Sequence, residues 1–336
     1  MSFLEEITQL HKFHLDHSAE YKRIINLLYK NNNKKFHSSA DIPFLPVRFF
    51  KEYELKSIPL DSIYKTMYSS GTSGKKSKIF LDKQTSQSQT RTLLNLGKKF
   101  LGDKRLPMLV FENSSIEESR NNFSARIAGI NGFRIFSKKV FYILNEHEEI
   151  NQDQILRVLD EFPDSPIFLF GFTSVIWNTI NNLKQFSVFK KFKQNMILIH
   201  GGGWKKLSDR NYTNDDFKKM VYEKISNKCK VINYYGMIEQ TGSIFFECPE
   251  GRFHETEFSE ILIRDLNNFQ VIDDERPGLI QINSLIPESY PGHAILSEDI
   301  GIRYNNHCKC GNYKNSFNIL GRVPRAEVRG CSDATT

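Results

Sequence analysis

A stretch of small hydroxylated residues, glycines and lysines, YSSGTSGKKSKIFLDK, occupies residues 68–83. Gly71 and Gly74 let the backbone bend so that its N–H groups converge on an anion. The spacing is not that of a P-loop, G-x-x-x-x-G-K-[ST], because the glycines are only three residues apart. The segment predicts a polyphosphate site, with a hydroxyl-rich surface turn as the alternative. Further donors come from Ser69, Ser70, Thr72 and Ser73 and from Lys75, Lys76 or Lys78.

Three further segments place glycine, aromatic and carboxylate residues after predicted strands. LIHGGGWKK at 198–206 permits close approach of a flat ligand, NYYGMIEQTG at 233–242 adds an aromatic ring and a carboxylate, and ILSEDIGIRY at 295–304 adds a second carboxylate. A base, a ribose diol and a divalent cation require such groups, so these segments favour a nucleoside triphosphate site. The residues concerned are Gly201, Gly202, Gly203, Tyr235, Gly236, Glu239 and Asp299.

Four residues of the C-terminal third could hold a metal ion. Cys248 and His254 flank the turn PEGRF, and Cys308 and Cys310 lie in CKCG. Three thiols and one imidazole form a closed tetrahedral zinc site, and glycine-containing turns suit paired zinc knuckles. The sequence predicts structural Zn²⁺ here, with three buried thiols as the alternative. The remaining Cys229 is expected in the core.

Cys331 could act as a nucleophile. It follows Arg325 and Arg329 on a short tail, and cationic neighbours lower the pKa of a thiol and favour the thiolate. From the residues by themselves, a stray exposed cysteine is an equally good reading.

Alternating strand and helix patterns would position these groups. Apolar residues at helical spacing predict a helical region over residues 4–30, which includes His11, His14 and His17 on an expected surface helix. Short apolar runs then alternate with amphipathic stretches, which indicates a layered α/β fold, and from about residue 243 the pattern becomes strand-rich. We expect four regions: 1–60 helical, 61–242 an α/β nucleotide- and acyl-binding core, 243–322 a β-rich subdomain with the zinc site, and 323–336 a tail.

Composition excludes several classes of protein. The chain has 336 residues and a net charge of +7, but its lysines are interleaved with Asn and acidic residues, which favours a solvated face over nucleic-acid binding. No apolar run approaches the length of a membrane span, and the acidic N-terminus lacks the features of a signal peptide. We expect a cytoplasmic protein without disulfides.

Taken in order, the motifs resemble the adenylate-forming superfamily of acyl-CoA synthetases, luciferases and peptide-synthetase adenylation domains. SSGTSGKKSK is similar to SSGTTGxPK, YGMIE to YGxTE, SEDIG to the TGD motif, and GRVPRAEVRG to GRxDDxxKxxG. The resemblance implies an adenylate-forming N-terminal domain with ATP and Mg²⁺: Tyr235 stacks on adenine beside the glycines at 201–203, Glu239 holds Mg²⁺, Asp299 binds the ribose, and Arg322 assists nearby.

Within that superfamily the chain resembles the LuxE-type acyl-protein synthetases. It shares IPFLPVRFFK, SSGTSGKKS, GGGWK, EDIG and RGCSD with them, and only 14 residues follow Arg322 where larger members continue into a C-terminal lid domain, so no lid domain is expected. Cys331 matches their acyl-accepting cysteine.

The resemblance implies ATP-dependent activation of a carboxylic, fatty acid to an acyl-adenylate. Transfer to Cys331 and then to a partner protein, a reductase or a transferase, would follow. A CoA ligase of the phenylacetate type and a nucleotide-binding scaffold are the alternatives. Candidates for an apolar acyl pocket are Phe123, Arg126, Phe170, Phe172 and Thr173.

Overall fold

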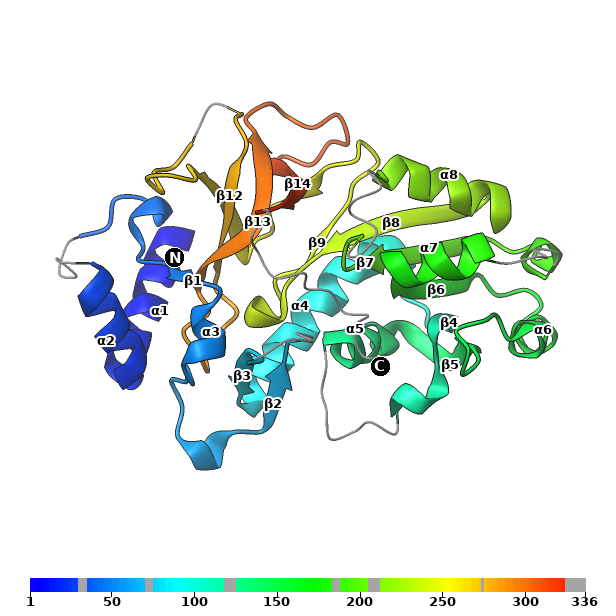
Figure 1. Ribbon diagram of the computed structural model, residues 1–336, viewed down its shortest axis with the longest axis horizontal. Coiled ribbons are helices and arrows are strands. Elements are labelled where there is room, and N and C mark those ends of the chain that lie inside the picture. The colour runs from blue at the N-terminus through cyan, green and yellow to red at the C-terminus, as the bar shows by residue number, and fades with distance from the viewer. Residues whose placement is uncertain are drawn as a thin grey trace. The chain divides into compact units, whose positions relative to one another are not determined.

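The computed structural model describes residues 1–29, 35–69, 75–117, 125–182, 188–204, 212–272 and 275–323 (Figure 1). The chain divides into two compact units. Of the described residues, 1–69, 75–90 and 236–323 belong to unit 1, and those between 91 and 235 belong to unit 2. In the described part of the chain, none of the helices has the length and hydropathy that crossing a bilayer requires.

Unit 2 is built on parallel strands. They are hydrogen-bonded in the order β5-β4-β6-β7-β8, so the chain reverses direction across the sheet after β5. The strands are β4 (Leu106–Asn113), β5 (Ser137–Leu144), β6 (Ile167–Phe172), β7 (Met196–Gly201) and β8 (Cys229–Tyr235). These strands consist largely of buried apolar residues, as expected when helices cover both faces of a parallel sheet.

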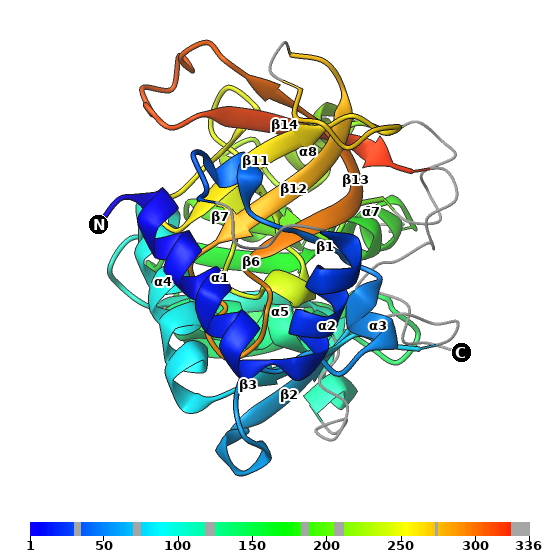
Figure 2. The ribbon, with the colours of Figure 1, turned by 90° about the vertical axis from the view of Figure 1, so that its left-hand side faces the viewer.

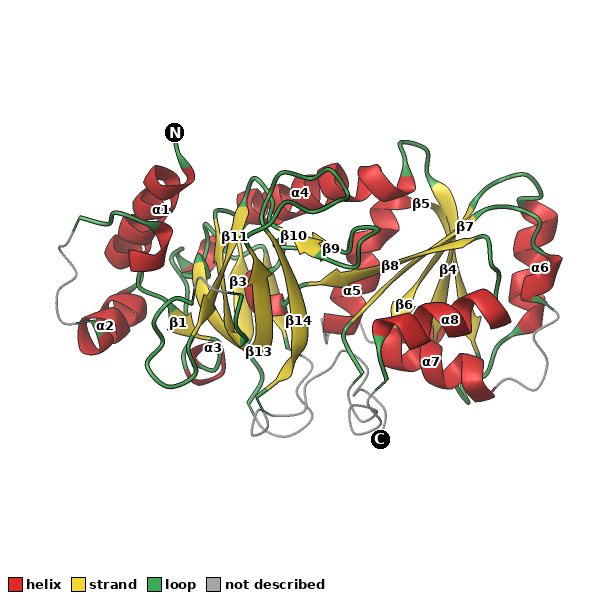
Figure 3. Ribbon diagram, turned by 90° about the horizontal axis from the view of Figure 1, so that it is seen from above, coloured by secondary structure: helices red, strands yellow, loops and turns green. Residues whose placement is uncertain are grey.

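Helices supply the two outer layers of unit 2. One core cluster joins one face of the strands to α6 (Gln152–Glu161), α7 (Thr173–Asn182) and α8 (Asn214–Lys224). Helices α7 and α8 lie side by side, as Figures 1 and 3 show. On the opposite face, the Phe133 ring of α5 (Ala125–Phe133) packs against Phe168 and Phe170 of β6. Unit 2 is therefore a three-layer α/β structure, as the alternating pattern predicted.

Unit 1 contains an antiparallel sheet in the order β10-β14-β13-β12-β11. Its strands are β10 (Phe253–His254), β11 (Ser259–Arg264), β12 (Gly278–Ser284), β13 (Ala294–Tyr304) and β14 (Ser316–Arg322). β1 (Leu45–Pro46) pairs parallel with β13, and Val47 N–H donates to the carbonyl of Leu296. The Pro-rich segment near residue 45 is thereby part of the sheet that carries Asp299.

The remaining elements of unit 1 are short apart from three helices. Helix α1 (Phe3–His17) begins with a capping box of Ser2 and Glu5, and Ser18 then separates it from α2 (Ala19–Leu28), which packs against α1 (Figure 2). Helix α4 (Lys83–Leu101) starts in unit 1 and ends in unit 2. The others are α3 (Phe49–Glu52), β2 (Lys65–Tyr68), β3 (Lys78–Leu81), β9 (Phe245–Phe246) and the 3-10 turns Ser39–Asp41, Leu60–Ser62 and Ile238–Gln240.

The expectation that the three histidines lie on a surface helix is wrong for two of them. His11 and His14 are buried, whereas His17 is exposed. His14 bonds to the Ser57 hydroxyl (2.7 Å) and the Pro287 carbonyl (3.0 Å), and its ring stacks on His293. His11 and His14 are three residues apart, so the helix repeat places both on the buried face of α1, where polar partners satisfy their rings.

Candidate functional site

The hydroxyl-rich loop closes on a two-stranded hairpin of unit 1. β2 and β3 pair in register from Lys65–Leu81 to Tyr68–Lys78. Beyond them, Ser69 N–H donates to the Ser77 carbonyl (3.1 Å) and Ser77 N–H donates to the Ser69 hydroxyl (2.9 Å). Ser69 is thus part of the loop's base. Ser70, Gly71, Thr72, Ser73 and Gly74 lie outside the described residues.

The lysines after this loop have different surroundings. Lys75 pairs with Glu52 (2.9 Å) and Lys78 with Glu54 (2.6 Å). Lys76 is exposed, and no carboxylate pairs with it among the described residues. Because the two ion pairs are exposed and therefore weak, they leave the choice among the three candidate cations open.

Glu239 is buried in unit 1 at the turn Ile238–Gln240. Its carboxylate accepts a hydrogen bond from the Ser77 hydroxyl (2.6 Å). The Gln240 amide donates to the carbonyls of Ile282 and Gly292 (both 2.8 Å), which fixes the backbone of the turn. Burial, with a smaller contribution from the Glu239 charge, raises the pKa of Tyr290. A carboxylate is thus held at the base of the loop, a contact that the sequence pattern did not reveal.

Asp299 and Arg322 are partners in the register of β13 and β14. The Nε of Arg322 lies 3.1 Å from Oδ1 of Asp299, and its Nη2 donates to Glu298 (3.0 Å). Glu298 also accepts a hydrogen bond from Arg48, which lies two residues after the end of β1. Both Asp299 and Arg322 are partly exposed, and the ion pair between them restricts the orientation of the Asp299 carboxylate. Sequence reasoning assigned no role to Arg48 or Glu298, although Arg48 lies in IPFLPVRFFK and Glu298 lies in SEDIG.

In unit 2, the glycines follow the carboxyl end of β7. Gly202 and Gly203 have φ values of 83° and 69°, which glycine adopts without strain. At Gly201 a Cβ would lie 2.7 Å from both a ring carbon and the carbonyl oxygen of Tyr234. Glycine is therefore required for the close approach of β7 to β8. Tyr235 is the last residue of β8, and Gly236 begins the final segment of unit 1.

The acyl-pocket candidates are buried in unit 2 where they are described. Arg126 forms an ion pair with Glu112 (2.7 Å), and burial raises the pKa of that carboxyl. The Thr173 hydroxyl contacts His200 Nδ1 (2.9 Å) and donates to the Gly201 carbonyl (3.0 Å). The rings of Phe170 and Phe172 contact each other. Phe123 lies outside the described residues.

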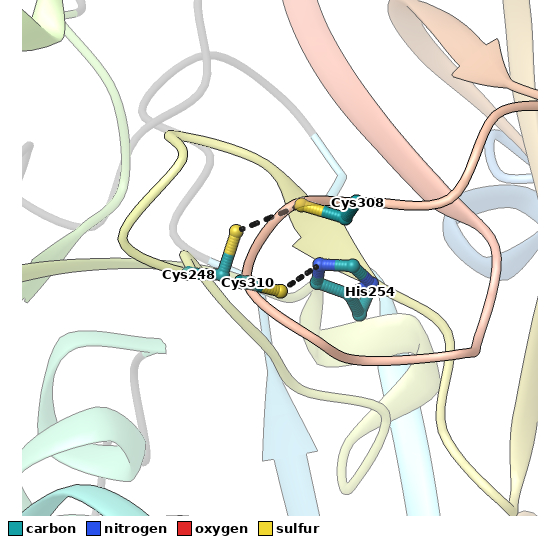
Figure 4. Close-up of side chains that lie close together, drawn as sticks. All are labelled: Cys248, His254, Cys308 and Cys310. Carbon is teal, nitrogen blue, oxygen red and sulfur yellow. Dashed lines mark hydrogen bonds between the residues drawn. The ribbon is translucent and has the colours of Figure 1, made fainter.

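The structure brings Cys248, His254, Cys308 and Cys310 together, as Figure 4 shows. One ligand atom from each lies within 4.8 Å of the others; the sulfurs of Cys248 and Cys308 are 3.7 Å apart, and Cys310 Sγ is 3.3 Å from His254 Nε2. These separations suit a tetrahedral site with Zn–S bonds of about 2.3 Å.

The surroundings of the cluster also suit a metal. His254 Nδ1 contacts the Lys314 carbonyl (3.1 Å), which directs Nε2 toward the thiols. Burial lowers the pKa of His254 and so favours the neutral imidazole that binds metal. Gly251 and Gly311, with φ of 72° and 83°, close the two turns that carry the cysteines. Cys229 is separate and buried, and burial raises the pKa of its thiol to about 12.

Cys331, the predicted nucleophile, lies outside the described residues, as does the tail from residue 324.

Comparisons with known proteins agree with the family that the motifs indicated. The family described as acyl-protein synthetase, LuxE, matches residues 3–336. The chain is 22% identical over 303 residues to the long-chain-fatty-acid--luciferin-component ligase of Aliivibrio fischeri, covering 86% of this chain and 76% of the relative. It is 21% identical over 328 residues to the ligase of the same description from Vibrio harveyi, covering 96% of this chain and 84% of the relative.

Solved structures share the fold. An open conformation of 2-hydroxyisobutyryl-CoA ligase in complex with 2-HIB-AMP and CoA is similar with a TM-score of 0.71 at 13% identity, over 96% of this chain and 69% of that one. The luciferase-like enzyme of the nonluminescent mealworm Zophobas morio gives a TM-score of 0.52 at 14% identity, over 80% of this chain and 60% of that one. The mixed α/β fold resembles the N-terminal domain of adenylate-forming ligases, as the motifs predicted.

Proposed function

Because the chain belongs to the LuxE acyl-protein synthetase family and is a ligase of that type, we propose that it activates a fatty acid with ATP and transfers the acyl group to its own Cys331. The observation that carries the proposal is the buried carboxylate of Glu239 at the base of the hydroxyl-rich loop. A carboxylate at the base of a loop whose sequence is rich in hydroxyl groups and lysines suits a magnesium-bound polyphosphate.

The first half-reaction forms an acyl-adenylate. The carboxylate oxygen of the acid attacks the α-phosphorus, the bond to the β-phosphate oxygen breaks, and pyrophosphate leaves. Glu239 would hold Mg²⁺, which would supply neutralisation of charge on the phosphate oxygens. Lys76 and the loop at residues 69–74 donate to the developing negative charge. By the resemblance, Asp299, which pairs with Arg322, would accept from the ribose hydroxyls. Tyr235 and the glycines at 201–203 would, by the same resemblance, contact adenine.

In the second half-reaction the Cys331 thiolate attacks the activated carbonyl carbon. A thioester forms, AMP leaves with the electrons of the broken bond, and the thiol proton passes to solvent. A reductase or transferase would then accept the acyl group from Cys331. Support for this half comes from the family's sequence pattern, RGCSD, at residues 329–333.

The test combines exchange and labelling. Wild-type protein should catalyse fatty-acid-dependent exchange of labelled pyrophosphate into ATP and should acquire a hydroxylamine-sensitive acyl label. Cys331→Ser should keep the exchange and lose the label; Cys229→Ser, which removes a buried core thiol, is the control and should keep both.

Free CoA is the third arm of this experiment. If CoA is acylated by Cys331→Ser while wild-type protein is never labelled, the chain is a carboxylic acid-CoA ligase. Absence of exchange with every acid of a broad panel, with a copurifying partner present, would refute adenylation.

We also propose that Cys248, His254, Cys308 and Cys310 hold one structural Zn²⁺. The convergence of the four ligand atoms supports this assignment. Because the cluster closes the turns before β10 and β14, metal would stabilise the fold of unit 1. Elemental analysis of protein prepared without chelator should find one zinc per chain, and finding none would exclude the site.

A further inference from the structure

Three polar groups of Ser77 form hydrogen bonds within unit 1. Its carbonyl accepts from Ser69 N–H (3.1 Å), its N–H donates to the Ser69 hydroxyl (2.9 Å), and its own hydroxyl donates to Glu239 (2.6 Å). The side chain is fully buried. Ser77 therefore joins both stems of the hydroxyl-rich loop to the carboxylate through one residue.

The backbone of Glu239 is fixed from the other side. Gln240 is anchored to the carbonyls of Ile282 and Gly292 (both 2.8 Å). A Cβ at Gly292 would lie 3.1 Å from the Glu239 carbonyl oxygen, so the two backbones are in close approach. The sheet thus holds the main chain of Glu239, and the Ser77 hydroxyl donates a hydrogen bond to its carboxylate.

We propose that Ser77 is a positioning residue for Glu239 in the adenylation reaction. A hydroxyl that donates to an ionised carboxylate makes one of the stronger hydrogen bonds in proteins and restricts the rotation of the acid. A divalent cation held by Glu239 would then meet a carboxylate that is already oriented, so less conformational entropy would be lost on binding. The inference rests on the proposed function, because it assigns Glu239 to the cation.

Four variants separate positioning from packing. Ser77→Ala removes the donor, Ser77→Thr keeps it, and Ser77→Cys keeps the size with a weaker donor. Ser289→Ala is the matched control in unit 1: Ser289 is also fully buried, and its hydroxyl donates to a backbone carbonyl, that of Phe80 (2.9 Å), instead of a carboxylate.

The assay measures pyrophosphate exchange as Mg²⁺ is varied. Loss of a hydrogen bond to a charged group should raise the half-saturating Mg²⁺ concentration, or lower the exchange rate at a given Mg²⁺ concentration, by about tenfold or more in Ser77→Ala. Ser77→Thr should stay within about threefold of wild type, and Ser289→Ala should have the wild-type Mg²⁺ dependence even where its stability falls. If Ser77→Ala does not fold, Ser77→Cys carries the test with a smaller shift in the same direction.

The outcomes are distinguishable. Exchange in wild type together with a Ser77→Ala variant whose Mg²⁺ dependence matches Ser289→Ala overturns the role of Ser77 and leaves adenylation intact. A Ser77→Thr variant as impaired as Ser77→Ala also overturns it, because the defect would then follow shape and not the donor. No exchange in wild type overturns the proposed function and the inference with it.

Discussion

Buried histidines should make the folding stability of unit 1 depend on pH, and His14 is the clearest case. Burial lowers the pKa of His14 from 6.5 to about 3, although its hydrogen bond to the Pro287 carbonyl opposes the shift. In the folded protein the ring is therefore neutral at every pH above about 3. The unfolded chain, with an ordinary imidazole, takes up a proton as pH falls below about 6.5.

The sign follows from this difference in bound protons. Above about pH 6.5 both states are neutral at His14 and stability does not depend on this group. Below that pH the unfolded state binds the proton and the folded state does not, so stability falls by about 1.4 kcal/mol per pH unit until the folded pKa is reached. At about pH 5 the loss attributable to His14 is about 2 kcal/mol.

His14→Gln tests this magnitude because glutamine keeps hydrogen-bonding groups and cannot titrate. The free energy of unfolding, from urea denaturation followed by circular dichroism, should be measured between about pH 7.5 and about pH 5. The variant should be less stable at neutral pH but should lose about 2 kcal/mol less than wild type over this range.

His17→Gln is the control, since His17 is exposed on the same helix, and it should follow the wild-type curve. Burial also lowers the pKa of His11, to about 4, and the pKa of His293. Both groups act in the same direction as His14, so the free energy of unfolding of the variant should still fall with pH, but less steeply. An unchanged slope in His14→Gln would refute the reasoning, because the buried ring would then not be the group that resists protonation.

Three further predictions concern the metal cluster, β7 and the ribose carboxylate. Removing zinc with a chelator, or Cys310→Ser, should lower Tm by about 10 °C or more in calorimetry, since losing a structural metal costs several kcal/mol; an unchanged Tm would contradict a structural role. Gly201→Ala should lower the free energy of unfolding, measured by urea titration, by about 1–3 kcal/mol, because its Cβ would lie 2.7 Å from Tyr234. A loss below about 0.5 kcal/mol would show that β7 and β8 can move apart to accommodate the methyl group and would contradict the prediction. Asp299→Ala should weaken ATP binding by about 1.5–3 kcal/mol in calorimetric titration, and wild-type affinity for ATP would exclude Asp299 as the ribose ligand.

Local features of the sequence determined the secondary structure and the family. The predicted alternation of short apolar runs with amphipathic stretches corresponds to strands such as β7 and β8 and helices such as α6 and α8. Such periodicity is readable because buried faces recur at the helix or strand repeat within a few residues. The motif order was likewise sufficient to indicate the LuxE family, which the match over residues 3–336 confirms.

Local reasoning also predicted that the four candidate metal ligands lie together. Cys248 and His254 flank one tight turn, and Cys308 and Cys310 belong to another, so two pairs were set by the chain itself. Pairing of β10 with β14 then brings the two turns together. The metal that they hold remains a prediction.

Contacts between distant segments were decided by the tertiary structure. Ser77 and Glu239 are 162 positions apart, and no pattern in either segment indicates that one bonds to the other. His11 and His14 are polar residues on a helix with exposed neighbours, so local pattern favoured a surface position; they are buried because Ser57, Pro287 and His293 supply polar and aromatic partners from elsewhere in the chain. A polar side chain can be buried only where a partner satisfies it, and that partner is chosen by packing of the whole unit, which sequence periodicity does not encode.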